Sequence, residues 1–197
     1  MPITINGSGT ITGLSVGGLP DGIVDADTLA AGAAGLVKTV HNTKLDTFSS
    51  TTSDAWTDIT GVTLTNTPAS ASNKHVGVFY INWGRGTVNH YICGFRVTRS
   101  IAGATATVVA NSVHGSATGG AADYQSQMHG MRAMYDANGT TTTAISLYDA
   151  PNTTSECVYQ VQFYSEQEGT FYLNRSHGDG TVSGRGTYQG ILQEVSV

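Results

Sequence analysis

Histidine and acidic side chains are the groups of this chain that could bind a metal or transfer protons, and their spacing decides which chemistry is open to it. The six histidines are spread along the sequence, at His41, His75, His90, His114, His129 and His177. None of them forms the HxH or HExxH spacing that brings ligands to one metal ion. The spacing therefore predicts structural or surface roles for the histidines, with no metal site and no cofactor.

Ser176, His177 and Asp179 offer the three side-chain types of a hydrolase triad within one short segment. A working triad is assembled from distant parts of a fold, with its nucleophile raised on a strained turn. Three near neighbours in a glycine-rich run do not meet that geometry, so the run is interpreted as a loop. Pairs of acids for glycoside cleavage are also unsupported, because the candidates lie in turns or at strand ends: Asp149, Glu156, Glu166 and Glu168. We expect a protein that is not an enzyme, and a polysaccharide depolymerase is the third hypothesis.

Two Gly-Arg-Gly segments, at residues 84–86 and 184–186, are only superficially like phosphate-binding loops. Neither carries the Lys-Ser/Thr pair of a P-loop at the start of a helix. Arg185 is instead predicted to contact an acidic polysaccharide. Tyr124, in a loop, and Tyr148, at a strand end, are predicted to contact a sugar face or a protein. Recognition on rigid scaffolds is carried by loops, and the candidates here are loops 84–90, 111–126, 149–155 and 175–187.

Composition limits the partners of the chain. The formal net charge is −5, and the nine Lys and Arg residues are scattered, whereas a nucleic-acid partner requires a clustered basic patch. No stretch approaches the ~20 apolar residues of a membrane span, and the N-terminus lacks the pattern of a signal peptide. We therefore expect no nucleic-acid partner, no membrane insertion and synthesis in a cytoplasm. Only 12% of residues are charged, against about 25% in average proteins, which is typical of β-rich surface proteins.

The two cysteines, Cys93 and Cys157, fall within strand-like runs. We interpret them as buried free thiols that pack as small apolar side chains. A disulfide between them is the alternative if their strands are neighbours, although a cytosolic origin disfavours it.

The elements that position these residues change character near residue 35. Residues 3–16 alternate apolar and polar side chains, with apolar ones at Ile3, Ile5, Ile11 and Leu14. Strands this short bury too little surface to stand alone, whereas three chains wound about one axis would bury them. Residues 1–35 are therefore predicted to be an intertwined stalk. Residues 36–197 are predicted to be a separate head domain.

The head reads as an all-β domain. Strand-like runs with polar turns recur along it: 36–48, 56–64, 75–83, 90–99, 105–109, 127–135, 140–148, 157–165 and 188–197. Residues 75–83 are apolar on both faces, which predicts a central strand. Asp136-Ala137-Asn138-Gly139 predicts a hairpin turn. Roughly eight to ten short strands at this spacing indicate a jelly-roll β-sandwich.

Three segments resemble tail fibre proteins of bacteriophages, and the resemblance is greatest to those of aquatic and cyanobacterial phages. The first segment is residues 5–30, from Ile5-Asn6-Gly7-Ser8-Gly9-Thr10 to Asp25-Ala26-Asp27-Thr28-Leu29-Ala30. The second is the central pattern that begins at Trp56-Thr57-Asp58-Ile59 and continues to Lys74-His75-Val76. The third is Phe171-Tyr172-Leu173-Asn174-Arg175 through Gly184-Arg185-Gly186-Thr187. Heads of these proteins are similar to the jelly rolls of complement-type and tumour-necrosis-factor-like trimers.

The resemblance implies a homotrimeric virion protein, made in a host cytoplasm, that attaches the particle to a glycan or protein on the host surface. It also implies that the stalk contacts other tail or capsid proteins and attaches to the virion through Ile3, Ile5, Ile11 and Leu14. It supplies no catalytic motif. The chain departs from the pattern in being short for a full tail fibre, with fewer than 200 residues. A capsid-decorating or connector fibre with a purely structural role is therefore the main alternative. In a trimer, a row such as Gln127, His129 and Met131 could meet its copies on the axis and hold an ion or water.

Overall fold

A computed structural model describes residues 4–5, 11–12, 35–86, 92–109, 129–133, 139–165, 169–179 and 184–197. The chain divides into two compact units, Met1–Gly35 and Leu36–Val197. In the first unit, β1 (Thr4–Ile5) pairs antiparallel with β2 (Ile11–Thr12), with Ile5 opposite Ile11. The side chains of Ile5 and Ile11, and the whole of Ile3 and Leu14, lie outside the described part of the structure. Their predicted role in attachment stays a prediction.

The first sheet of the second unit is centred on β6 (Lys74–Arg85), the longest strand. Along one edge of β6 runs β10 (Thr141–Asp149), and along the other run β13 (Tyr188–Val195) and then β12 (Phe171–Leu173). Outside these lie β3 (Leu36–Lys44) and β4 (Phe48–Ser50). All of the pairings are antiparallel, and the predicted central place of residues 75–83 is confirmed.

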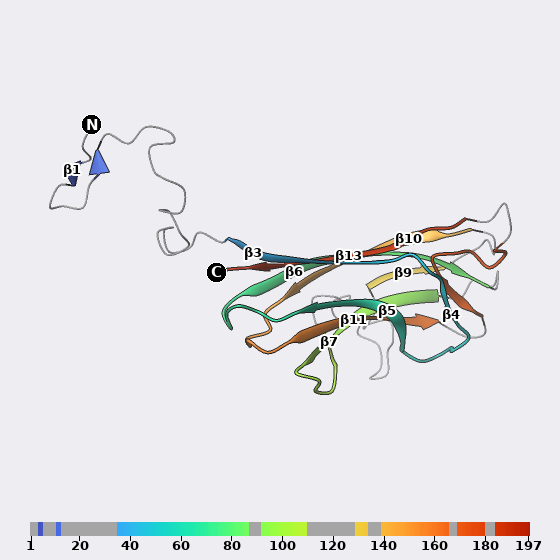
Figure 1. Ribbon diagram of the computed structural model, residues 1–197. Coiled ribbons are helices and arrows are strands. Elements are labelled where there is room, and N and C mark those ends of the chain that lie inside the picture. Colours follow the sequence, from blue (N-terminus) through green and yellow to red (C-terminus); the bar gives the residue numbers. More distant parts are fainter. Residues whose placement is uncertain are drawn as a thin grey trace. The chain divides into compact units, whose positions relative to one another are not determined.

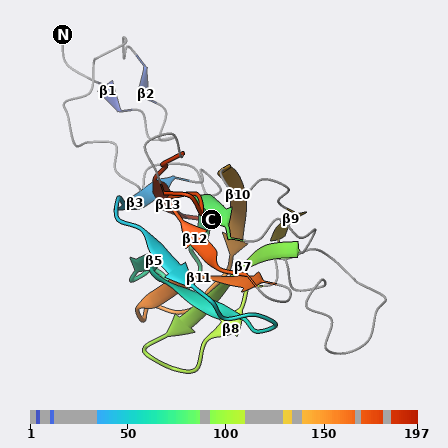
Figure 2. The same cartoon turned by 90° about the vertical axis from the view of Figure 1, so that its right-hand side faces the viewer.

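The second sheet packs face to face against the first, as the two layers in Figure 1 show. Its order is β5 (Thr57–Asn66), β11 (Cys157–Ser165) and β7 (Ile92–Ile101). Two short strands pair with the far edge of β7, namely β8 (Thr107–Val108) and β9 (His129–Ala133). Figure 2 gives the view along the layers.

The connectivity is that of a jelly roll. From β5 the chain crosses to β6 in the other sheet and back to β7, and from β10 it crosses to β11 and back to β12 and β13. Repeated crossing of this kind produces the paired Greek keys of the fold. No helix occurs in the described residues of the second unit. The predicted all-β jelly-roll fold is therefore confirmed.

The core between the sheets is built on strand alternation. In β11, for example, Cys157, Tyr159, Val161 and Phe163 point inward and are fully buried. Aromatic rings fill one half of the core, where Phe163 stacks on Phe171 with centroids 4.3 Å apart. Trp83 meets Phe95 edge-on at 5.4 Å. Rings of this size contribute most of the apolar area that stabilises such a sandwich.

Two details of the expected architecture differ from the structure. The turn at Asp136–Gly139 was predicted to close a hairpin, yet β9 pairs with β7 and β10 pairs with β6 in the opposite sheet. An Asn-Gly signal is local and does not determine which sheet the next strand joins, so the hairpin prediction is wrong. Phe171–Leu173 forms β12, a strand that is absent from the predicted strand-like runs.

The cysteines are both buried free thiols, as predicted. Cys157 lies opposite Ile101 and Cys93 lies opposite Ser165, so the two are at opposite ends of the β7–β11 pair. From 157 to 165 is eight residues, or about 26 Å at the rise of a β-strand. A disulfide requires Cα atoms within about 7 Å, so the alternative of a Cys93–Cys157 disulfide is excluded.

Candidate functional site

The two ends of the sandwich are built from different connections. We call proximal the end where β3 begins at Leu36, opposite Val195 near the end of β13. We call distal the end where β6 finishes at Arg85, opposite Phe171 of β12. Predicted contact loop 149–155 follows β10 at the proximal end. The described parts of loops 84–90 and 175–187 share the distal end, where Gly86 N donates to the main-chain oxygen of Thr170.

Arg185 belongs to a cluster of charged and aromatic side chains at the distal end. It lies opposite Arg175 in an antiparallel bridge, and Asp179 joins the two guanidinium groups, at 2.6 Å from Arg185 and 3.3 Å from Arg175. Arg175 also lies 4.1 Å from the ring centre of Tyr172, which is 5.8 Å from the ring of His177. Two guanidinium groups and one carboxylate leave one net positive charge. The Arg185 side chain is 62% exposed, so it is accessible to an anionic partner.

The loop that holds this cluster is fastened to the rest of the first sheet. Asn174 and Asp179 have φ angles of 61° and 38°, in a left-handed region that non-glycine residues keep only where their surroundings fix them. Asn174 Nδ2 donates to the main-chain oxygens of Lys44 and Asp46, at 2.8 and 2.9 Å. The ion-paired loop is thereby held on the β3–β4 connection.

Tyr148 lies on the outer face of the first sheet, away from the distal cluster. Its side chain is 50% exposed, and it stands opposite Val76 of β6. Tyr80 and Ile191 are exposed on the same face, at 44% and 36%. Arg185 and Tyr148 are therefore not brought together.

Tyr124 and loop 111–126 lie outside the described residues, as do the side chains of the row 127–131.

The outer face of the first sheet carries no formal charge on the positions that pair across its four long strands. The register aligns Tyr148–Val76–Gln193–Thr39, Ser146–Val78–Ile191–His41 and Ala144–Tyr80–Gln189–Thr43. We call these twelve positions the uncharged face. Depletion of charged residues, with aromatic and aliphatic side chains at the centre, distinguishes the core of protein interfaces from ordinary surface. The face is thus suited to contact another protein surface.

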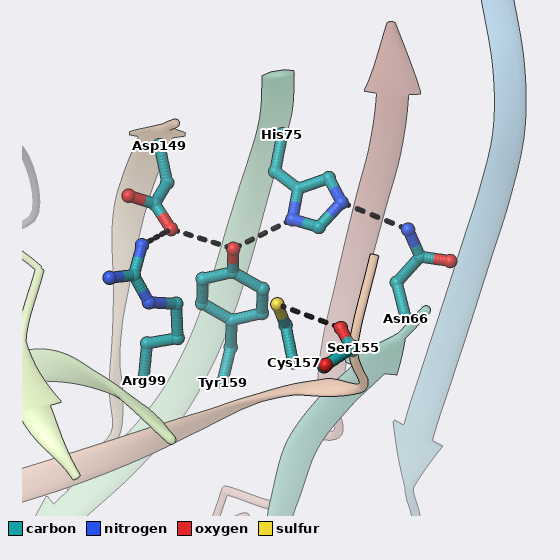
Figure 3. Close-up of polar contacts among 7 residues, drawn as sticks. All are labelled: Asn66, His75, Arg99, Asp149, Ser155, Cys157 and Tyr159. Atoms are coloured by element: carbon teal, nitrogen blue, oxygen red, sulfur yellow. Dashed lines mark hydrogen bonds and ion pairs between the residues drawn. The ribbon is translucent and has the colours of Figure 1, made fainter. Parts of the chain in front are cut away.

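A chain of buried and half-buried polar groups crosses the sandwich at the proximal end (Figure 3). The first sheet contributes Asp149, His75 and Glu194, which are neighbours across β10, β6 and β13. The second sheet contributes Arg99 and Tyr159, which are directly opposite each other on β7 and β11, and also Asn66 of β5. His75 and Tyr159 are fully buried, and Glu194 is 1% exposed. Each strand therefore extends its inward face with a polar residue at this end.

The hydrogen bonds run continuously from one carboxylate to the other. Asn66 Nδ2 donates to Glu194 Oε2 and lies 2.9 Å from His75 Nε2. His75 Nδ1 lies 2.6 Å from the Tyr159 hydroxyl, which donates to Asp149 Oδ2 at 2.7 Å. We call Glu194, Asn66, His75, Tyr159, Asp149 and Arg99 the polar chain.

Charged partners close both ends of the polar chain. Arg99 Nη1 lies 2.5 Å from Asp149 Oδ2. Glu194 Oε1 accepts from Ala69 N and Asn73 Nδ2, at 2.7 and 2.6 Å. Burial by itself acts to raise the pKa of Glu194, but the hydrogen bonds from Asn66, Asn73 and Ala69 lower it overall. This carboxylate is therefore held ionised within the sandwich.

Burial also determines the state of the other titratable groups here. It lowers the pKa of His75, although the nearby Glu194 and Asp149 carboxylates act in the opposite direction. It raises the pKa of the Tyr159 hydroxyl, together with the bond to Asp149. It raises the pKa of Cys157, whose thiol lies 3.6 Å from the main-chain oxygen of Ser155. At neutral pH the site therefore holds a neutral imidazole, a neutral phenol and two ion-paired or hydrogen-bonded carboxylates.

The polar chain was not predicted from the sequence. His75 was interpreted as a strand residue, and Asp149 only as a candidate glycosidase acid. A usable signal was present in the alternation: His75 shares its parity with Phe79 and Ile81, and Glu194 shares its parity with Leu192. What the alternation could not supply is the register that aligns these residues across three strands.

No group of three or more His, Cys, Asp or Glu side chains in the described ranges is arranged to hold a metal ion. Within the same ranges there is no helix of the length and apolarity that crossing a bilayer requires.

Comparison with known proteins identifies no family and gives only distant structural similarities. No family model matches the chain, and no curated protein matches it. Among solved structures, Eiger TNF from S. frugiperda aligns over 79% of this chain and 90% of its own, with 7% identity and a TM-score of 0.37. A mutant VP2 protein of infectious bursal disease virus aligns over 83% of this chain and 38% of its own, with 10% identity and a TM-score of 0.37. A VP2 subviral particle gives 13% identity, a TM-score of 0.33 and coverage of 83% and 40%. Likenesses this distant support no conclusion about function.

Proposed function

We propose that the chain is a homotrimeric fibre protein of a virion whose head attaches the particle to a host surface. The proposal rests on the resemblance of three sequence segments to phage tail fibres and on the jelly-roll head. Its main structural support is the position of Arg185 and its ion-paired loop at the distal end. Leu36, where the chain enters the head, lies at the opposite, proximal end. A fibre attached through the residues before Leu36 leaves the distal loops free to meet a receptor.

The uncharged face is the proposed contact between copies of the head. Val76, Tyr80 and Ile191 are each at least a third exposed on one surface, and a contiguous exposed apolar area of this kind marks an interaction site. Packing the uncharged face against further copies of the head removes its apolar side chains from water and buries no unpaired charge. Light scattering after size exclusion should give three times the chain mass of 20.5 kDa. The mass of a single chain would overturn the trimer.

The receptor class that the distal cluster favours is an acidic saccharide. Arg185 presents a mostly exposed guanidinium group, which recognises carboxylates in a bidentate manner. Three linked heads would raise a weak single-site affinity through avidity. No catalytic role is proposed for the cluster.

The test is adsorption of the full chain to an immobilised polyuronate, with neutral dextran as the reference surface. We expect Arg185→Ala to weaken binding on the order of tenfold, equivalent to about 1.4 kcal/mol. Lys38→Ala is the matched control, since it removes an equal charge from an exposed position of β3. Equal loss in both variants would reduce the effect to net charge and would remove Arg185 from the contact.

Antibody-gold labelling of intact virions tests the placement. Label at the tail supports attachment. Label spread over the capsid supports the alternative, a decorating or connector fibre with a structural role.

A further inference from the structure

The hydrogen bonds of the polar chain determine which atom carries each proton. The assignment follows from Glu194, at one end of the polar chain. The Glu194 carboxylate is an acceptor, so Asn66 must turn its amide nitrogen toward it. The same nitrogen then directs its second hydrogen at His75 Nε2. His75 Nε2 must therefore be unprotonated, and its proton is on Nδ1, where it is donated to Tyr159 Oη. The Tyr159 hydroxyl in turn donates to Asp149, which forms an ion pair with Arg99.

A second proton on His75 has no place in this arrangement. A proton on Nε2 would point at the amide hydrogen of Asn66. Turning the Asn66 amide would offer its oxygen to His75 but would direct the same oxygen at Glu194 Oε2, so two acceptors would face each other. Moving the imidazole instead breaks its bond to Tyr159. Protonation of His75 therefore costs at least one hydrogen bond in a fully buried site, where an unmade bond is expensive.

Charged and titratable groups face His75 from four strands. Glu194 comes from β13, Asp149 from β10, Arg99 from β7, and Tyr159 and Cys157 from β11. The two carboxylates attract a proton on His75, but each already has hydrogen-bond or ion-pair partners. Glu194 accepts from three N–H donors, and Asp149 contacts Arg99 and Tyr159. Burial outweighs the two carboxylates, and the net effect disfavours the imidazolium.

The polar chain also anchors a segment of the proximal end. Ala69 N and Asn73 Nδ2 hold connection 67–73 on Glu194, and Asn66 ends the strand that leads into it. We propose that His75 is a proton-sensitive lock: its protonation breaks the polar chain and releases segment 66–73 together with the end of β13. This inference is independent of the proposed function and holds whatever the protein binds.

The direction of the pH effect follows from linkage. His75 takes up a proton more readily in the unfolded chain, where its ordinary pKa is 6.5. Its neutral form therefore contributes stability that is complete above pH 6.5 and is lost as pH falls toward the lowered folded-state pKa. Between pH 7.5 and 5.5 this one residue can reduce the folding equilibrium constant by up to about tenfold.

The test compares hydrogen exchange of the full chain at pH 7.5 and 5.5, corrected for the intrinsic exchange rates. In the wild type, we expect peptides covering 66–73 to lose protection on acidification while those covering 157–165 keep it. His75→Gln can accept from Asn66 and donate to Tyr159 without titrating, so its protection should not change between the two pH values. His177→Gln is the control, because His177 is exposed at the distal end and lies outside both the polar chain and the uncharged face, and it should behave as the wild type. Unchanged wild-type protection, or an equal loss in His75→Gln, overturns the lock.

A measurement on the wild type keeps the proposal falsifiable if His75→Gln does not fold. Long-range ¹H–¹⁵N correlation spectra report the tautomer of each histidine ring. We expect His75 to carry its proton on Nδ1 at pH 7.5. A ring protonated on Nε2, or a charged ring at that pH, overturns the proposal.

Discussion

The distal and proximal ends of the sandwich are closed by opposite means. At the distal end, Trp83, Phe95, Phe163 and Phe171 pack ring against ring, the Arg85 side chain is buried, and the ion-paired loop with Arg185 stays at the surface. At the proximal end, the buried Glu194 and His75 and the half-buried Asp149 and Arg99 are joined across the sheets by directional hydrogen bonds. Ring packing tolerates changes in pH, because it depends on area and shape. The polar chain depends on the protonation of each member, so one fold combines a pH-tolerant end with a pH-sensitive one.

The largest effect is expected from removing a ring at the distal end. Phe171→Ala deletes the partner of Phe163 and Trp83 and leaves a cavity, which should lower the free energy of unfolding by about 3–5 kcal/mol. Denaturant unfolding at pH 7.5 and 5.5 measures it. The loss should be the same at both pH values, and a loss confined to the acidic sample would contradict the contrast between the ends.

A somewhat smaller loss is expected from opening the polar chain at its cationic end. Asp149→Ala leaves the Arg99 guanidinium, 20% exposed in its side chain, without its carboxylate, and removes the acceptor of Tyr159. Breaking one partner of such a pair typically costs about 3 kcal/mol. Thermal and urea unfolding are the measurements. Asp58→Ala, on the outer face of the second sheet, is a control that should lose much less.

The loss of folding stability at acidic pH should depend on Glu194. Its pKa is lowered in the folded chain from an ordinary value of 4.5, so it contributes stability that is present above pH 4.5 and lost as pH falls through the folded-state value. Glu194→Gln should therefore lose stability less steeply below pH 4.5, with a slope that is smaller by at most about 1.4 kcal/mol per pH, the limit for one proton. Unfolding free energies between pH 3 and 7 measure the slope. Identical slopes in the variant and the wild type would refute the role.

The smallest effect on stability is expected at the exposed distal ion pair. Arg185→Ala removes a side chain that is 62% exposed, and exposed pairs contribute about 0–1 kcal/mol. A melting temperature within a few degrees of the wild type is the expected result. This variant thus separates binding from folding in the saccharide experiment above.

Alternation along the chain predicted most of the strands, because a two-residue period survives wherever one face is buried. It found β6, β7, β10 and β11 to within a few residues. It missed β12, since three residues are too few to show a period, and it misassigned the turn at Asn138-Gly139, since a turn does not specify a sheet. Arg185 was found because a glycine-flanked arginine is conspicuous. His75, Asp149 and Glu194 were not assembled, because they lie far apart in sequence and meet only through strand register.

The separation of the two cysteines turns them into built-in reporters. Cys93 is buried at the distal end and Cys157 at the proximal end, and the chain has no others. A thiol reagent reaches each one only when its own end of the sandwich opens, so two labelling rates, resolved by peptide mass, time the opening of the two ends in one unmodified sample.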